Sequence, residues 1–245
     1  MNLPDIVDRI GDIADLDDEL QEVLPYVQTC AKAYRWIRKK RIVHFLRSLD
    51  SALSGTDERE REKFEKYVFS DPGQELLADY SDTVLLTSSR IAQSALALLF
   101  ADVDNAKYSE AFKRMATTSL RGCSDQLVHL FVHLLELPFE QRNEAPYAVR
   151  FIDPADLDRF SVLHCLAATN EEAIIFTNDL IRRGMLMPDH AGGRLGGDEG
   201  DWSFVFGISN DSMTFLTLLK RAEAMLDNGS KQTPAGDSLK AAPEE

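Results

Sequence analysis

Residues 91–101, with the sequence IAQSALALLFA, decide the fold of this chain. Only Gln93 and Ser94 interrupt the apolar residues, so a helix over this stretch is apolar on almost every side. Such a helix has to be surrounded by other elements. It is too short to cross a membrane, because a spanning helix needs roughly 20 apolar residues. We therefore expect the central helix of a soluble helical bundle and no transmembrane segment.

Apolar residues at helical spacing continue on both sides of the central stretch. Upstream, the pattern predicts an acidic helix before Pro25, then a basic helix, then a short charged helix that Asp57 and Glu60 cap. The basic helix has a clear core face, formed by Ile42, Phe45, Leu46, Leu49 and Leu53. One long helix, or two in line, is expected over residues 72–101. Around this core we expect a helical bundle.

Downstream of the central stretch, further helices are expected at about residues 108–121 and 125–137, and residues 139–152 read as a connection. The order of elements then changes to helix, helix, hairpin, helix. The predicted segments are helices at 153–166 and 170–183, strands at 185–187 and 202–208 around a flexible tip at 192–200, and a final helix from residue 211. This order is typical of a winged-helix-like unit.

The predicted fold class is mainly α, a helical bundle with a C-terminal winged-helix-like unit that contains one small β-hairpin. Residues 1–54 hold the acidic helix and the basic amphipathic helix, and residues 55–152 form the bundle. The winged-helix-like unit covers residues 153–226. Residues 227–245 are rich in Ser, Lys, Ala, Pro and Gly, so we expect a disordered tail.

Charge is distributed unevenly along the first 50 residues. The whole chain has a net charge of −14, which repels nucleic acid and anionic lipid on average. Residues 1–22 contain eight acids and one base, whereas residues 32–47 contain seven bases and no acid. These bases are Lys32, Arg35, Arg38, Lys39, Lys40, Arg41 and Arg47, and Tyr34, Trp36 and Phe45 lie among them. Any contact with an anionic partner is therefore expected here.

The candidate partner-binding residues are Lys32, Arg35, Trp36, Arg38, Lys39, Lys40 and Arg41. A protein partner is the leading expectation, and nucleic acid or an anionic membrane surface stays open through residues 32–47. A plainer interpretation is a solvated helix face, or one that pairs with the acidic first helix of the same or another subunit. A homo-oligomer is also left open.

Asp125, His129 and His133 follow each other at intervals of four residues, which places them on one stripe of a helix. Two histidines at this spacing can bind zinc, and the alternative function is therefore a metal-dependent hydrolase. The glutamate that follows the first histidine in HExxH metalloproteases is missing. The plainer interpretation is the polar face of an amphipathic helix. No catalytic residue and no cofactor are predicted.

Other features agree with a reduced cytoplasmic protein. Cys30, Cys123 and Cys165 are odd in number and lack CxxC spacing, and the acidic N-terminus does not resemble a secretory signal. The glycines at 192–197 lack the Lys-Ser/Thr ending of a phosphate-binding loop. His164 and Cys165 lie within an apolar helical pattern and are expected in a core.

One family resemblance covers residues 70–226. Its first part is LLFAD at 98–102, then Phe112, Met115, Leu120 and Ser124-Asp125, and its second part is LIRRGML at 180–186, then WSFVF at 202–206 and Phe215. This pattern resembles the bacterial abortive-infection proteins of the alpha type. Residues 209–211 and the long glycine-rich tip depart from it. The resemblance implies a helical protein linked to phage defence and transfers no active-site residue.

These observations predict a non-enzymatic cytoplasmic interaction or regulatory protein that docks through its basic N-terminal segment. The resemblance associates it with phage defence.

Overall fold

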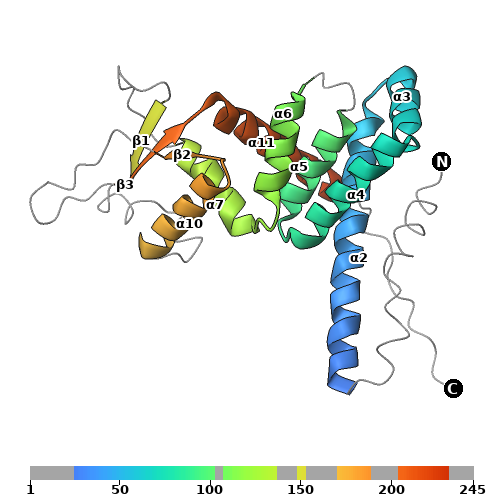
Figure 1. Ribbon diagram of the computed structural model, residues 1–245, viewed down its shortest axis with the longest axis horizontal. Helices are drawn as coiled ribbons and strands as arrows, with labels where there is room; N and C mark the ends of the chain where they lie inside the picture. The colour runs from blue at the N-terminus through green and yellow to red at the C-terminus, as the bar shows by residue number, and fades with distance from the viewer. Residues whose placement is uncertain (1–24, 103–106, 137–147, 153–169, 189–203, 232–245) are drawn as a thin grey trace, which may run out of the picture.

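Helix α5 (Arg90–Ala101) is the centre of the molecule in the computed structural model (Figure 1), and every residue from Ile91 to Phe100 is buried. The two polar residues inside it are satisfied. Gln93 donates a hydrogen bond to the carbonyl of Thr87 (2.7 Å), and the hydroxyls of Ser94 and Ser48 lie 2.8 Å apart. The predicted central helix is confirmed.

The structure describes residues 25–102, 107–136, 148–152, 170–188 and 204–231. Four predicted segments therefore lie outside the described residues: the acidic helix before Pro25, the helix at 153–166, the glycine-rich tip and the tail after residue 231.

The other helices of the bundle are α2 (Pro25–Ser54), α3 (Glu58–Val68), α4 (Asp71–Leu86), α6 (Glu110–Leu120) and α7 (Asp125–Glu136). They are followed by α10 (Asn170–Arg182) and α11 (Asn210–Lys231). Helices α2, α4, α6, α7 and α11 all contact α5. Figure 1 shows helix α11 passing back across the bundle, so the core is closed by the last of the described elements.

Capping residues explain where several helices begin. The side chains of Asp57, Ser70, Ser89 and Ser109 each accept a hydrogen bond from a backbone N–H in the first turn of the helix that follows. Ser89 also decides between the alternatives for residues 72–101, which form two helices and not one. The chain is extended at Thr87 and Ser89, and the hydroxyl of Thr87 donates to the carbonyl of Leu120 (3.0 Å). This hydrogen bond holds the residues between α4 and α5 against the C-terminal end of α6.

A close backbone contact explains why residue 73 is a glycine. A Cβ atom on Gly73 would lie 1.9 Å from the carbonyl oxygen of Tyr67, so only glycine lets the start of α4 cross the end of α3. Gly122 has a φ of +74°, which favours glycine in the turn between α6 and α7.

A small antiparallel sheet lies at the far end of the molecule from α2 (Figure 1). Its strands are β1 (Ala148–Ile152), β2 (Met187–Pro188) and β3 (Phe204–Ile208), in the order β1-β3-β2. The β2–β3 pair is the predicted hairpin. With the helices around it, this hairpin confirms the predicted fold class.

Strand β1 was not expected, because residues 139–152 read as a connection. Its residues pair along the whole length of β3, from Ala148 with Ile208 to Ile152 with Phe204. The predicted division after residue 152 assigned β1 to the bundle, and the pairing places it with the C-terminal unit. At the other end, α11 continues to Lys231, past the predicted start of the tail at residue 227.

The core is one continuous apolar cluster from α2 to α11. Phe100 packs against the rings of Phe45, Phe64 and Tyr80, with centroids 6.2, 5.6 and 5.3 Å away. A second aromatic group joins α6, α7 and α11 through Phe112, Phe131 and Phe215. Within the described ranges, none of the helices combines the length and the hydropathy that crossing a bilayer requires.

Candidate functional site

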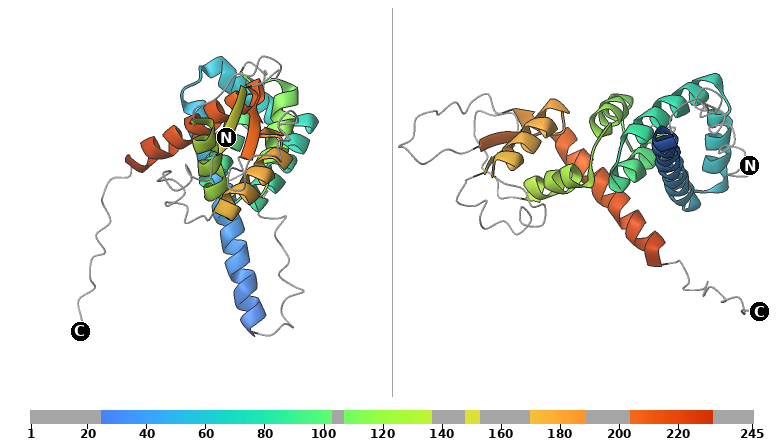
Figure 2. Two further views of the ribbon diagram at one scale, coloured as in Figure 1. Left: turned by 90° about the vertical axis from the view of Figure 1, so that its left-hand side faces the viewer. Right: turned by 90° about the horizontal axis from the view of Figure 1, so that it is seen from below.

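The first half of α2 projects from the body of the protein, as Figure 1 and the left view of Figure 2 show. The second half of the same helix is embedded, with Ile42, Phe45 and Leu46 buried against α5. We call residues 33–41 of α2 the basic arm. The arm contains five bases and no acid, and its apolar side chains are exposed. The exposed fractions are 58% for Tyr34, 62% for Trp36 and 41% for Ile37.

Two of the basic side chains of the arm stack on its aromatic rings. The guanidinium of Arg38 lies 5.4 Å from the ring centroid of Tyr34, and the ammonium of Lys40 lies 4.9 Å from that of Trp36. Both pairs are four residues apart, which places their members on one side of the helix. Each contact orders a cation and a ring into one unit without neutralising the charge.

The predicted partner-binding residues differ in their exposure and in their contacts within the protein. Lys39 and Lys40 are exposed and Arg38 is partly buried, and none of the three contacts a carboxylate within the described residues. Arg41 is already engaged, because it donates a hydrogen bond to the carbonyl of Leu85 at the end of α4. Arg35 is partly buried, and the side chain of Lys32 lies outside what the structure describes. The exposed positive charge is therefore concentrated at residues 38–40.

The exposed rings of the arm do not share a face. Tyr34 and Trp36 are two residues apart, which separates them by about 200° around a helix of 3.6 residues per turn. A helix that lies on a membrane surface needs one continuous apolar face. In the arm, exposed Ile37 lies between the two rings, but Lys40 and Arg41 fall within the same arc and interrupt it. This mixed pattern is better suited to contacts with a shaped protein surface.

The predicted metal stripe is not assembled. His129 and His133 border a small cavity of about 160 Å³ between α7 and α11, together with Glu136 and Glu223, but Asp125 does not line it. Glu136 is paired with Lys220 at 2.8 Å. Across the ranges that the structure describes, no three His, Cys, Asp or Glu side chains are grouped so that they could hold a metal ion. The metal-dependent hydrolase stays a prediction with no assembled site behind it.

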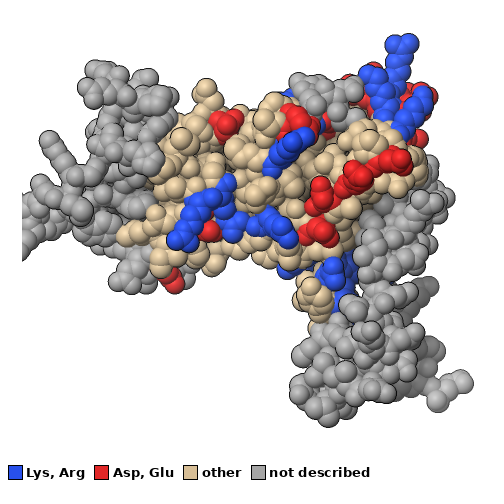
Figure 3. All heavy atoms as spheres, in the orientation of Figure 1, with Lys and Arg blue, Asp and Glu red and all other residues tan. Residues whose placement is uncertain are grey.

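A larger cleft of about 330 Å³ lies between α4 and α6. Leu76, Asp79, Tyr80, Asp82 and Thr83 line its α4 wall, and Lys113, Arg114, Thr117 and Arg121 are among the residues of its α6 wall. The Tyr80 side chain is buried at the base, and burial raises its pKa to about 12, although a hydrogen bond with Thr117 opposes this. Figure 3 shows acidic side chains along α4 and basic ones over α6. This cleft could not be predicted from the sequence, because its walls come from two helices that are separated in the chain and meet only in the fold.

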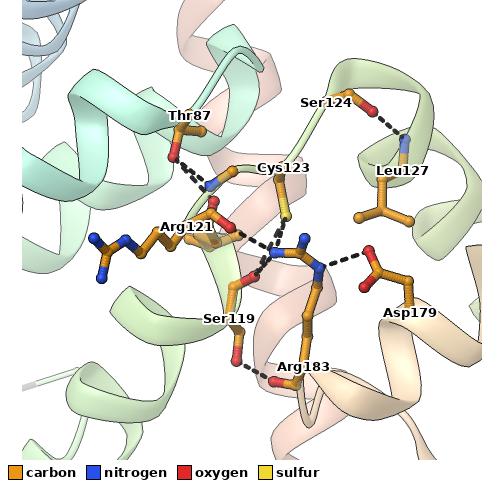
Figure 4. Close-up of polar contacts among 10 residues, drawn as sticks. Thr87, Ser119, Arg121, Cys123, Ser124, Leu127, Asp179 and Arg183 are labelled. Carbon is orange, nitrogen blue, oxygen red and sulfur yellow. Dashed lines mark hydrogen bonds and ion pairs between the residues drawn. The ribbon is translucent and has the colours of Figure 1, made fainter.

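Arg183 fastens the C-terminal unit to the bundle (Figure 4). Its Nη1 donates to the carbonyls of Ser119 (3.1 Å) and Arg121 (2.6 Å), and its Nε pairs with Asp179 (2.8 Å). Its own carbonyl accepts a hydrogen bond from the hydroxyl of Ser119. Burial raises the pKa of the neighbouring Cys123 thiol to about 11, although Arg183 favours the thiolate. Cys123 is therefore a neutral core thiol, and this network is structural.

His44 makes the stability of the protein depend on pH. It lies where α2 meets α5, with Nε2 3.3 Å from the carbonyl oxygen of Arg90 and from Ser94 Oγ. Burial lowers the pKa of His44 below 6.5, and Arg90 and Arg47 lower it further, whereas the hydrogen bond to Arg90 and the charge of Asp125 oppose this. Burial also lowers the pKa of His133. As the pH falls through 6.5, these two imidazoles therefore take up protons in the unfolded chain before they do so in the folded one.

Lowering the pH from 7.5 to 5.5 is accordingly expected to reduce the free energy of unfolding, measured by urea denaturation. The His44→Gln variant should lose part of this dependence, because its side chain stays uncharged. His129→Gln removes an exposed imidazole and is the control, expected to keep the dependence of the unchanged protein. An identical pH dependence in the His44→Gln protein would contradict the assignment.

Comparison of the chain with protein-family models, with curated proteins and with solved structures found no match. The resemblance to abortive-infection proteins of the alpha type therefore stays a prediction.

Proposed function

We propose that this chain is a non-enzymatic cytoplasmic interaction protein that binds an acidic segment of a protein partner through its basic arm. The observation that supports this most directly is the exposure of Trp36 beside Lys40 on a helix that projects from the body. Trp, Tyr and Arg dominate the binding energy of protein interfaces, so an exposed tryptophan among bases is a suitable anchor for a partner.

Two alternatives to an acidic protein are less well supported. Nucleic acid affinity comes mainly from neutralising phosphates with many bases, and the body next to the arm carries a net negative charge that opposes it. A membrane surface requires the continuous apolar face that the arm lacks. A folded partner with an acidic patch and a hollow for one aromatic ring meets both properties of the arm. The proposed phage-defence association rests on the family resemblance alone.

The test compares the unchanged protein with an arm variant in which Arg38, Lys39 and Lys40 are all replaced by Gln. Arg41 is left in place, because its hydrogen bond to Leu85 belongs to the fold. The probes are polyglutamate, phosphatidylserine vesicles and single-stranded DNA, at about 0.15 M salt, where the Debye length is about 8 Å. We expect polyglutamate to bind most tightly, and the arm variant to lose at least about tenfold in affinity, equal to about 1.4 kcal/mol.

The matched control is a variant with Arg59, Arg61 and Lys66 replaced by Gln. These three bases are exposed on α3, so the control has the same net charge as the arm variant. It should bind polyglutamate as the unchanged protein does. Equal losses of polyglutamate affinity in both variants would show a response to net charge alone and refute the proposal. Tighter binding of DNA or vesicles than of polyglutamate would also refute it, and would indicate nucleic acid or a membrane surface as the partner.

A further inference from the structure

Helix α4 has an acidic face whose negative charge complements the positive charge of the basic arm. Asp71, Glu75, Asp79 and Asp82 are all exposed and follow each other at intervals of four, four and three residues, so they form one stripe. The helix contains no lysine or arginine. Figure 3 shows this stripe as a row of acidic side chains on the surface. Among the described residues, none of these four carboxylates forms an ion pair, and we call them the acidic face of α4.

The cleft between α4 and α6 opens beside the acidic face, and Asp79 and Asp82 border both. Its volume of about 330 Å³ is within the range of about 300–1,000 Å³ that holds small-molecule-sized groups, which is enough space for one indole ring. On the α6 wall, Lys113 pairs with Asp102 and Arg114 with Glu110. Arg121 also lies on the α6 wall, which is therefore basic. A cation that enters the cleft is expected to lie against the acidic α4 wall.

We propose that the basic arm of one copy of this chain docks on the acidic face of α4 of a second copy. Trp36 enters the cleft, and Lys40, which stacks on the Trp36 ring, is thereby placed next to Asp79 and Asp82. Lys39 lies on the other flank of Trp36 and faces the rest of the acidic face, whereas Arg38 lies about 200° around the helix from Trp36 and contributes its charge at longer range. This inference rests on the proposed function, because it names the acidic partner that the arm binds.

A contact along the whole acidic face has to form between molecules. Helix α2 is continuous from Pro25 to Ser54, and Arg41 fixes it to Leu85 at the C-terminal end of α4. From this point the arm runs away from the body, so the N-terminal half of α4 in the same chain is out of its reach (Figure 1). The two lengths agree, since the stripe from Asp71 to Asp82 spans about 16 Å and residues 33–41 span about 12 Å at 1.5 Å per residue.

The two surfaces of this contact differ, so the contact is heterologous. A bound copy still offers a free arm at one end and a free acidic face at the other, and assembly therefore continues into chains or closes into rings. Because the contact is largely electrostatic, it should weaken as salt is raised toward about 1 M, where the Debye length is about 3 Å.

The test is sedimentation velocity over a range of concentrations of the full chain. The unchanged protein is expected to self-associate, and the arm variant should do so at least about tenfold more weakly. A face variant with Glu75→Gln, Asp79→Asn and Asp82→Asn should be weakened to the same degree. The control, with Glu58, Glu62 and Glu65 of α3 replaced by Gln, removes three exposed acids and should associate normally.

Mixing the two weakened variants gives the sharpest result. The arm variant retains its acidic face and the face variant retains its arm, so the mixture should form a one-to-one dimer that cannot grow further. Failure of the mixture to dimerise would overturn the inference, as would self-association that neither variant weakens.

The proposed function can fail separately from this inference. An unchanged protein that is monomeric at every concentration, but binds polyglutamate through the arm, would overturn self-docking and leave the function standing. If substituting the acids within residues 1–22 by amides then strengthened polyglutamate binding, the natural occupant of the arm would be that segment instead of α4.

Discussion

Replacing Asp102 by alanine is expected to lower the free energy of unfolding by about 3–5 kcal/mol, because it leaves the buried ammonium of Lys113 without its counter-charge. Asp102 Oδ2 lies 3.4 Å from Lys113 Nζ, and the side chains are only 8% and 9% exposed. The carboxylate also accepts hydrogen bonds from the backbone N–H groups of Lys107 and Tyr108. One side chain therefore connects the end of α5 to the start of α6.

Urea denaturation followed by circular dichroism measures this loss. The double variant Asp102→Ala, Lys113→Met removes both charges and should recover a large part of it, since an apolar replacement of a buried pair is often nearly neutral. Glu110→Gln breaks the exposed pair with Arg114 and is the control, with an expected cost of about 0–1 kcal/mol. A cost for Asp102→Ala similar to that of the control would contradict the structural role of the pair.

Replacing Phe100 by alanine is expected to cost about 3–5 kcal/mol, the range for truncating a buried phenylalanine. The Phe100 side chain is 2% exposed, and its ring contacts one aromatic ring from each of α2, α3 and α4. Truncation removes the point at which these three helices meet α5. The closest ring is Tyr80, which also lines the cleft.

Phe69→Ala is the matched control, because Phe69 lies in the turn between α3 and α4 with 53% of its surface exposed. It should change the free energy of unfolding by no more than about 0.5 kcal/mol. Phe100→Leu, which keeps most of the buried volume, should fall between the two. Equal midpoints of urea unfolding for Phe69→Ala and Phe100→Ala would show that the aromatic cluster is not the centre of the core.

Much of the candidate site could be predicted from the sequence. Bases without acids at residues 32–47 predicted a basic helix, and the apolar set from Ile42 predicted which part of it is embedded. The role of Arg41 could not be predicted, because its acceptor is a backbone carbonyl in another helix, 44 residues away. The acidic face of α4 was visible in the spacing of Asp71, Glu75, Asp79 and Asp82. Its significance depends on the cleft beside it, which the sequence does not show.

The sequence by itself determined the central helix, the cap at Asp57 and the core face of α2. These are local properties, since hydrophobic periodicity, caps and glycine act within one or two turns of a helix. Only the tertiary structure decided that residues 148–152 form a strand, that Arg183 fastens α10 to the turn after α6, and that the first half of α2 stands free while the second half is buried. Each of these depends on what lies opposite a segment in space, and long-range packing and pairing supply that partner.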